Sequence, residues 1–293
     1  MAYPENVGIK AMEIYVPGQC LDQSLFEQHQ GVSAGKYTIG LGLKYMNFCN
    51  DREALDGCYQ RLREKVEAAN QRTNGLGPKT DTNNLLNIFN YMAFHTPNCK
   101  IVSKSYGRLL YNDFRLDSDK SRWEATLTEE LRRLSYEESL KSKELEKIFV
   151  TQSKDLFKAR VEPCIAAPTL CGNMYTASLY CSLISLISHI DLRDSVGKTI
   201  GMFSYGSGIA STLYGLKITG DLSEMVQKID LMKRLEQREI CTPEQYEEAC
   251  FLRLKAYGAK GYEPAGSIEV MAPGTYYLQR VDDAYRRFYA VKS

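Results

Sequence analysis

A short aromatic run followed directly by a cationic segment limits the folds open to this chain. Tyr91–Phe94 is too short for a helix and is apolar, as buried strands are. After it come His95 and a Thr-Pro pair, and Pro97 suits the first helical position, with Thr96 as N-cap. We therefore expect a buried strand that leads into a helix reaching about Asn112.

The predicted helix carries cations at intervals of four residues, which places them along one face. These are Lys100, Lys104 and Arg108. A neighbouring, mostly apolar row that can face a sheet consists of Ile101, Ser105 and Leu109. A helix N-terminus carries partial positive charge and unpaired N–H groups, so His95 lies beside a place suited to an anion. A packed histidine with a solvated helix face is the alternative that these residues leave open.

The rest of the chain alternates strand-like and helix-like segments, which predicts an α/β fold. One sheet is expected from strands near 90–95, 199–204, 210–219, 275–282 and 286–291, the last two forming a hairpin across Asp283-Ala284. A further strand is expected near 9–16. Helices are expected near 21–28, 51–70, 126–158, 174–190, 222–239 and 243–256; the 126–158 group should be exposed and 174–190 buried.

Composition narrows the class of protein. With 44% hydrophobic and 25% charged residues in a chain of 293, we expect one large globular domain or two ordinary ones. A net charge of +1 gives no reason to expect nucleic acid or a membrane as partner. Nine cysteines without a CxxC pair, and a start that lacks a signal-like apolar region, predict reduced thiols and a cytoplasmic location, with no metal site.

Two short motifs could contact a ligand. In "FSYGSG" (203–208), glycines would let backbone N–H groups hold an oxyanion, although hairpin turns commonly look the same. In "CGNMYT" (171–176), Asn173 is a natural helix cap or an amide for a substrate carbonyl. Cys171 has no neighbour in sequence that would lower its pKa, so we do not assign it as a nucleophile.

Several stretches, in order from end to end, resemble eukaryotic 3-hydroxy-3-methylglutaryl-CoA synthases of the thiolase superfamily. They are "PENVGIKAMEIYVP", "QGVSAGKYTIGLG", "FHTPNCKIVSKS", "LYNDF", "GNMYTASLY", "FSYGSGIASTLY" and "GTYYLQRVDDAYRRFYA". The resemblance implies that His95 assists an acetoacetyl group and that Lys100 and Lys104 bind CoA. It further implies acyl contacts by Asn173 and Ser204, and CoA contacts by Ala34 and Lys36. Ser33 stands where the family often has Asp.

The resemblance also implies a reaction. The family is an acyltransferase family that condenses acetyl-CoA with acetoacetyl-CoA to HMG-CoA, in the mevalonate pathway of isoprenoid and sterol biosynthesis. It uses CoA thioesters as substrates with no further cofactor and no metal, and it forms homodimers. A thiolase-like duplicated fold is therefore expected.

One part of the family pattern is missing. Family members carry a "VGTET" glutamate that acts as base and a "NACYGG" cysteine that takes the acetyl group, and neither motif occurs here. Instead "MNFCNDRE" (46–53) runs directly into "ALDGCYQ" (54–60), which resembles a later part of the family. We interpret 1–53 as a remnant of the N-terminal half, mostly deleted, and 54–293 as a largely complete C-terminal half.

Three hypotheses follow from this gap. The chain is an HMG-CoA synthase whose sequence skips an internal segment, and it is then inactive alone. Alternatively it is a short, non-catalytic form that binds CoA or pairs with another subunit. The third hypothesis is a product that does not fold stably, because the lost half would leave apolar surface exposed.

Overall fold

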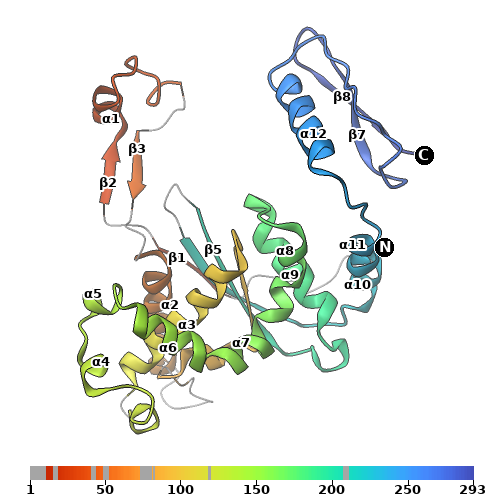
Figure 1. Ribbon diagram of the computed structural model, residues 1–293. Helices are drawn as coiled ribbons and strands as arrows, with labels where there is room; N and C mark the ends of the chain where they lie inside the picture. Colours follow the sequence, from red (N-terminus) through yellow and green to blue (C-terminus); the bar gives the residue numbers. More distant parts are fainter. Residues whose placement is uncertain are drawn as a thin grey trace. The chain divides into compact units, whose positions relative to one another are not determined.

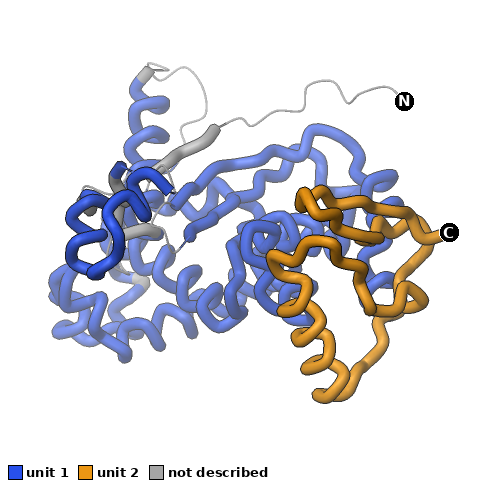
Figure 2. The backbone as a smooth tube through the Cα atoms, turned by 90° about the horizontal axis from the view of Figure 1, so that it is seen from above, with its two compact units in different colours: residues 1–236 blue, residues 237–293 orange. Residues whose placement is uncertain are grey.

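A computed structural model of the chain describes residues 11–15, 19–40, 44–48, 53–72, 81, 83–117, 120–206 and 211–293. Its contacts divide the chain into two compact units, 1–236 and 237–293, which Figure 2 distinguishes by colour. The predicted α/β class is confirmed, since strands and helices alternate along the described part (Figure 1). No helix in these ranges has the length and apolar character needed to cross a membrane.

The helices are α1 (Gln23–His29), α2 (Glu53–Arg72), α3 (Cys99–Leu116), α4 (Glu129–Arg133), α5 (Tyr136–Ser139), α6 (Lys143–Gln152), α7 (Lys154–Arg160), α8 (Glu162–Cys171), α9 (Ser178–His189), α10 (Ser223–Ile229), α11 (Leu231–Glu236) and α12 (Pro243–Ala256). Short 3₁₀ turns cover Leu85–Ile88, Ser121–Trp123, Tyr175–Ala177 and Leu192–Asp194. The strands are β1 (Ala11–Tyr15), β2 (Gln19–Asp22), β3 (Tyr45–Phe48), β4 (Tyr91–Phe94), β5 (Thr199–Tyr205), β6 (Ser211–Lys217), β7 (Tyr276–Val281) and β8 (Arg287–Val291).

A four-stranded sheet in the order β1-β6-β5-β4 forms the centre of the first unit. β4 runs parallel to β5, and the other neighbours are antiparallel. The predicted strands near 90–95, 199–204 and 210–219 are confirmed, and so is the N-terminal strand, which pairs with β6 along its whole length. Strands far apart in sequence therefore meet in one sheet.

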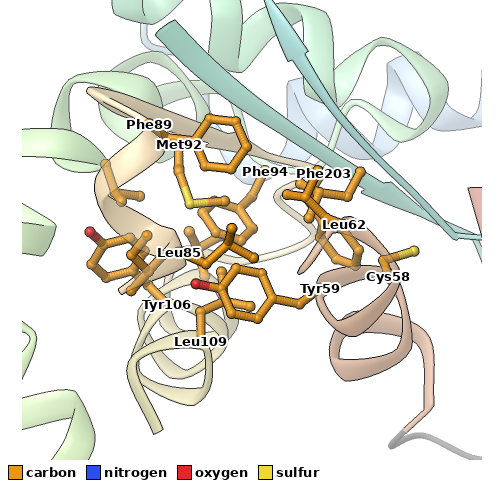
Figure 3. Packing of buried hydrophobic residues seen from close by; sticks show 14 of the residues in the cluster. Cys58, Tyr59, Leu62, Leu85, Phe89, Met92, Phe94, Tyr106, Leu109 and Phe203 are labelled. Carbon is orange, nitrogen blue, oxygen red and sulfur yellow. The ribbon is translucent and has the colours of Figure 1, made fainter. Parts of the chain in front are cut away.

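Alternation along the strands divides the core into two layers. On one face, Met92, Phe94 and Phe203 pack against α2 and α3, as Figure 3 shows. On the other face, Ala93 and Met202 pack with α8 and α9 residues. Because successive side chains of a strand point to opposite faces, helices must cover both sides of this sheet. Burying each large apolar side chain contributes roughly 1.5–3 kcal/mol.

The helices at 126–158 are less exposed than we expected. They form α4 to α7, and their inner faces bury Leu131, Leu145 and Phe149 against Trp123 and the end of α3. The α3 and α6 backbones approach closely at Gly107, where a Cβ atom would lie 3.0 Å from the Val150 backbone nitrogen. The charged residues that suggested exposure occupy only the outer faces.

Two ion pairs, one buried and one half-buried, join α2 to α3. The carboxylate of Asp113 accepts hydrogen bonds from the Tyr59 hydroxyl (2.9 Å), the Arg63 guanidinium (2.8 Å) and the Leu86 backbone N–H (3.1 Å). Arg108 donates to Asp56 at 2.8 Å. The Tyr136 hydroxyl also donates to the Asp56 carboxylate, at 2.9 Å. These contacts fix α2 against the helix that follows His95.

The prediction of one sheet that includes 275–282 and 286–291 is wrong. The hairpin itself is present, and Asp282 accepts a backbone hydrogen bond from Tyr285 at its turn. Its strands β7 and β8, however, form a separate two-stranded sheet in the 237–293 unit. A hairpin satisfies its backbone groups locally, so its sequence pattern does not specify which sheet it joins.

Candidate functional site

His95 and Ser204 lie at one edge of the sheet, where His95 directly follows the last residue of β4 and Ser204 is the next-to-last residue of β5. The strands run parallel with Phe94 opposite Phe203, and the His95 N–H donates to the Phe203 carbonyl at 2.8 Å. The next residue of β5 is Ser204, so the register places the two predicted site residues beside each other. Carboxyl ends of parallel strands are where α/β proteins commonly bind ligands.

The His95 imidazole is half-buried and packs edge-on against the Tyr205 ring, with centroids 5.2 Å apart and planes at 79°. Burial lowers the pKa of His95 from 6.5, so the ring is neutral at neutral pH. None of the described side chains hydrogen-bonds to it. A neutral imidazole can donate from one nitrogen and accept at the other, which suits a ligand carbonyl.

The helix after His95 does not start as predicted. The Thr96 N–H donates to the Ser178 hydroxyl (2.8 Å) and its hydroxyl to the Phe94 carbonyl (2.9 Å), so Thr96 is buried and cannot cap α3. Asn98 is the N-cap, accepting from the Ile101 N–H at 2.9 Å. Pro97 therefore precedes the helix. The helix also extends to Leu116, beyond the predicted end.

The apolar row that faces the core also differs from the prediction. Leu109 is buried as predicted, but Ile101 is exposed, and the other buried positions of α3 include Val102 and Tyr106. The predicted cations lie on α3, but two of the three form ion pairs with carboxylates of other helices. Lys104 forms an ion pair with Glu146 at 2.7 Å, and Arg108 is held by Asp56. Lys100 is exposed and forms no ion pair within the described ranges.

Asn173 does not cap a helix. Its side-chain oxygen accepts from the Tyr175 N–H at 2.8 Å, closing a turn, while α9 begins only at Ser178. Tyr175 has a φ of 51°, a backbone region that is costly for a non-glycine residue. The turn is exposed, and Ser178 at its far end bonds to Thr96. The loop that carries Asn173 is thus attached to the residue following His95.

Ala34 and Lys36 lie in a turn held by one carboxylate. Buried Glu27 accepts from the N–H groups of Gly35 (2.8 Å), Tyr37 (2.6 Å) and Thr38 (2.8 Å), and these bonds lower the pKa of Glu27. No described hydrogen bond, ion pair or ring contact joins this turn to His95. The structure thus brings together His95, Ser204 and the starts of α3 and α9, and leaves Ala34 and Lys36 apart.

Sequence reasoning missed Tyr205 and Ser178. Tyr205 supplies the ring against His95, and its position before the Gly-Ser turn was the available signal. Ser178 gave no local signal, because its partner is distant in sequence. The Ser207 and Gly208 backbone groups, considered for an oxyanion, lie outside the described residues. Across the described ranges, no cluster of His, Cys, Asp or Glu could hold a metal ion.

Comparison with protein families gives two matches. The family model described as hydroxymethylglutaryl-coenzyme A synthase C terminal matches residues 48–292. The model described as hydroxymethylglutaryl-coenzyme A synthase N terminal matches residues 3–87. Together the two models cover nearly the whole chain.

Curated relatives carry the same name. A hydroxymethylglutaryl coenzyme A synthase of Fusarium sp is 43% identical over 456 positions, covering 100% of both chains. The hydroxymethylglutaryl-CoA synthase of Saccharomyces cerevisiae is 42% identical, covering 99% of this chain and 91% of its own. Against hydroxymethylglutaryl-CoA synthase erg13A of Aspergillus fumigatus (45% identical), this chain spans only 58% of the relative's length.

Solved structures show the same fold. The protein described as MvaS in complex with 3-hydroxy-3-methylglutaryl coenzyme A aligns with a TM-score of 0.61 at 19% identity, covering 98% of this chain and 99% of its own. PksG, an HMG-CoA synthase from Bacillus subtilis, aligns with a TM-score of 0.56 at 19% identity, covering 85% of this chain and 53% of its own. The predicted thiolase-like fold is thereby confirmed.

Proposed function

Because the chain belongs to the hydroxymethylglutaryl-coenzyme A synthase family of acyltransferases, we propose that the sheet edge at His95 binds the acyl part of a CoA thioester. His95 and Ser204 would contact the acyl group, with Asn173 closing over it. Lys100 and Lys104 would attract the CoA phosphates along the exposed face of α3. The observation that carries this proposal is the register of β4 and β5, which sets His95 beside Ser204.

We further propose that this chain alone binds without condensing acetyl-CoA and acetoacetyl-CoA. The nucleophile and base motifs are absent from its 293 residues. The Fusarium alignment runs over 456 positions, so long stretches of that relative have no counterpart here. Cys58 is a poor replacement because it is fully buried. We propose that the family's reaction, which belongs to the mevalonate pathway, needs no cofactor beyond the CoA thioesters. We also propose a cytoplasmic location, where cysteine thiols stay reduced.

Calorimetry with CoA tests the binding role. The Lys100→Ala variant should bind CoA about two- to fivefold more weakly at low salt, because a charge contact near a helix end contributes roughly 0.3–1 kcal/mol. Lys104→Ala should lose less, since its ammonium already contacts Glu146. The difference should shrink near about 150 mM salt, where the Debye length is about 8 Å.

Two comparisons separate this site from general charge attraction. Lys147→Ala removes an exposed cation from α6 and should leave CoA binding unchanged. His95→Ala should leave CoA binding nearly unchanged while weakening acetoacetyl-CoA, because its proposed partner is the acyl group. A folded chain that does not bind CoA, or a Lys100→Ala/Lys104→Ala variant that binds as well as the parent, contradicts the proposal.

A second candidate function is pairing with another subunit, as a homodimer or with a full-length synthase. Its support lies in the 237–293 unit, where Val281 is the one large apolar side chain buried among the described residues. Ile240, Leu254 and Tyr257 are 98%, 72% and 89% exposed. Exposed apolar surface of this kind marks protein interfaces.

Sedimentation equilibrium of the purified chain tests this candidate. We expect a dimer at micromolar concentration, and replacing both Leu254 and Tyr257 by Ser should shift the mass toward the monomer. Arg253→Ser on the same helix is the control. A parent chain that stays monomeric at tens of micromolar concentration, a range in which stable dimers associate, rules out homodimer pairing.

A further inference from the structure

The helices α8 and α9 form an antiparallel pair whose register is fixed by hydrogen bonds (Figure 1). The Ala167 N–H donates to the Ser185 hydroxyl at 3.0 Å, and that hydroxyl donates to the Pro163 carbonyl at 2.7 Å. Ala167 and Ser185 therefore face each other across the two helices. Both side chains are small, which lets the helix axes approach closely.

The same register sets two cysteines opposite each other. Cys171 lies four residues after Ala167, and Cys181 lies four residues before Ser185. A step of four keeps a residue on the same helix face, so both cysteines lie on the facing sides, one turn nearer the connecting loop. Cys181 also lies three residues after Ser178, another residue that points inward.

The expected spacing suits a disulfide. Packed helix axes are about 8–10 Å apart and each Cα lies about 2.3 Å from its axis, so directly facing Cα atoms come to within about 3.4–5.4 Å. Disulfides join Cα atoms about 4.4–6.8 Å apart. Neither cysteine is in a disulfide in this structure, and both are half-exposed. A small oxidant can reach them.

Electrostatics also indicates that the two sulfurs are close. Burial, together with the Cys171 sulfur, raises the pKa of the Cys181 thiol. Two nearby cysteines, Cys164 and Cys99, are weaker candidates for a disulfide partner. Cys164 is completely buried, which raises the pKa of its thiol strongly. Cys99 contacts the Thr169 hydroxyl at 3.2 Å, on the opposite side of α8 from Cys171.

We propose that Cys171 and Cys181 are a redox-active pair that a peroxide converts to a disulfide. The Cys171 thiolate attacks hydrogen peroxide, breaking the O–O bond and giving a sulfenic acid and hydroxide. The Cys181 thiolate then attacks the sulfenic sulfur, and a second hydroxide leaves as the S–S bond forms. Overall, two thiols and one peroxide give one disulfide and two waters. The bond closes residues 172–180 into a ring.

That ring contains Asn173, which we propose contacts the acyl group, so any effect of oxidation on ligand binding rests on the proposed function. Formation of the disulfide itself does not depend on the proposed function. Chemical mapping of the bond can succeed or fail whether or not the chain binds CoA.

Peptide mapping of the full chain tests the pair. The folded protein is treated with hydrogen peroxide, remaining thiols are alkylated, and chymotrypsin cleaves after Tyr175 in the connecting segment and after Tyr180 in the first turn of α9. We expect a fragment pair linked through Cys171 and Cys181, absent without peroxide and released by a reductant. The rate of linking should rise with pH, because the pKa of Cys181 is raised and the thiolate that attacks therefore forms only at higher pH. Cys164 should be alkylated only after unfolding.

Matched variants make the result specific. Cys181→Ser should abolish the link and leave a sulfenic acid on Cys171 that dimedone traps. Cys250→Ser removes an exposed cysteine on α12 and should leave the link unchanged. The proposal is overturned if peroxide oxidises the folded parent without linking these two residues, or if Cys171 links to Cys99 instead.

Discussion

Replacing Arg63 by Met will lower the free energy of unfolding by about 3–5 kcal/mol at pH 8, the usual cost of removing one partner of a buried ion pair. Arg63 is 3% exposed and lies 2.8 Å from the carboxylate of Asp113, which is 1% exposed. Without the guanidinium, Asp113 keeps only the hydrogen bonds from Tyr59 and Leu86. Urea unfolding followed by circular dichroism measures the loss.

The loss should depend on pH. Burial raises the pKa of Asp113 from 3.8 to about 6, even with its hydrogen bonds and Arg63 present. The folded state therefore keeps a proton that the unfolded chain releases, and stability falls as the pH rises from about 4 to 6. In the Arg63→Met variant the ionised carboxylate is less favourable still. The deficit relative to the parent should thus be smaller at pH 5 than at pH 8.

Two further variants control this experiment. Arg61 lies on the same helix but is exposed, 3.9 Å from an equally exposed Glu64. Arg61→Met should change stability by less than about 0.5 kcal/mol. The double variant Arg63→Met/Asp113→Leu removes both charges and should recover most of the loss. An equal loss in the Arg61 and Arg63 variants, or no recovery in the double variant, contradicts a role for the buried pair.

The strand and helix around His95 illustrate what the sequence could and could not predict. The strand ending at Phe94 and the helix after it were predictable, because hydrophobic period and length are local signals. The N-cap was not, because Thr96 is bound by Ser178 from another part of the chain. Likewise, no spacing rule indicates that two cations of the predicted row form ion pairs with Glu146 and Asp56.

Some features of the candidate site were likewise predictable from the sequence, and others were not. Parallel pairing of two strands places His95 beside Ser204, and each was implied separately by its motif. The assignment of either residue to a ligand stays a prediction. Asn173 was interpreted as a cap from its position before a helix, but a 3₁₀ turn intervenes and its side chain closes a local turn. Boundaries between short elements depend on backbone geometry that residue type alone does not fix.

The largest expected effect is catalytic. The purified chain should form HMG-CoA from acetyl-CoA and acetoacetyl-CoA at a rate several orders of magnitude below that of the Fusarium relative assayed beside it. Loss of a covalent nucleophile costs on the order of 10³ to 10⁶ in rate at other covalent sites. Without an acetyl-enzyme thioester and a base, no enolate would form for the proposed role of His95 to act on. Mass spectrometry of the product against a no-enzyme control measures the rate.

Restoring the missing segment distinguishes a lost nucleophile from a damaged site. We expect a chain that receives the Fusarium relative's intervening segment between Glu53 and Ala54 to recover activity, and the same insert with its cysteine replaced by Ser to remain inactive. The site edge at His95 is built from β4, β5 and α9, which lie after the junction, so it should be usable once the nucleophile arrives. Steady HMG-CoA formation by the unmodified chain would overturn this argument. The search for its nucleophile would then turn to Cys49, outside the described residues, and to half-exposed Cys171 before buried Cys58.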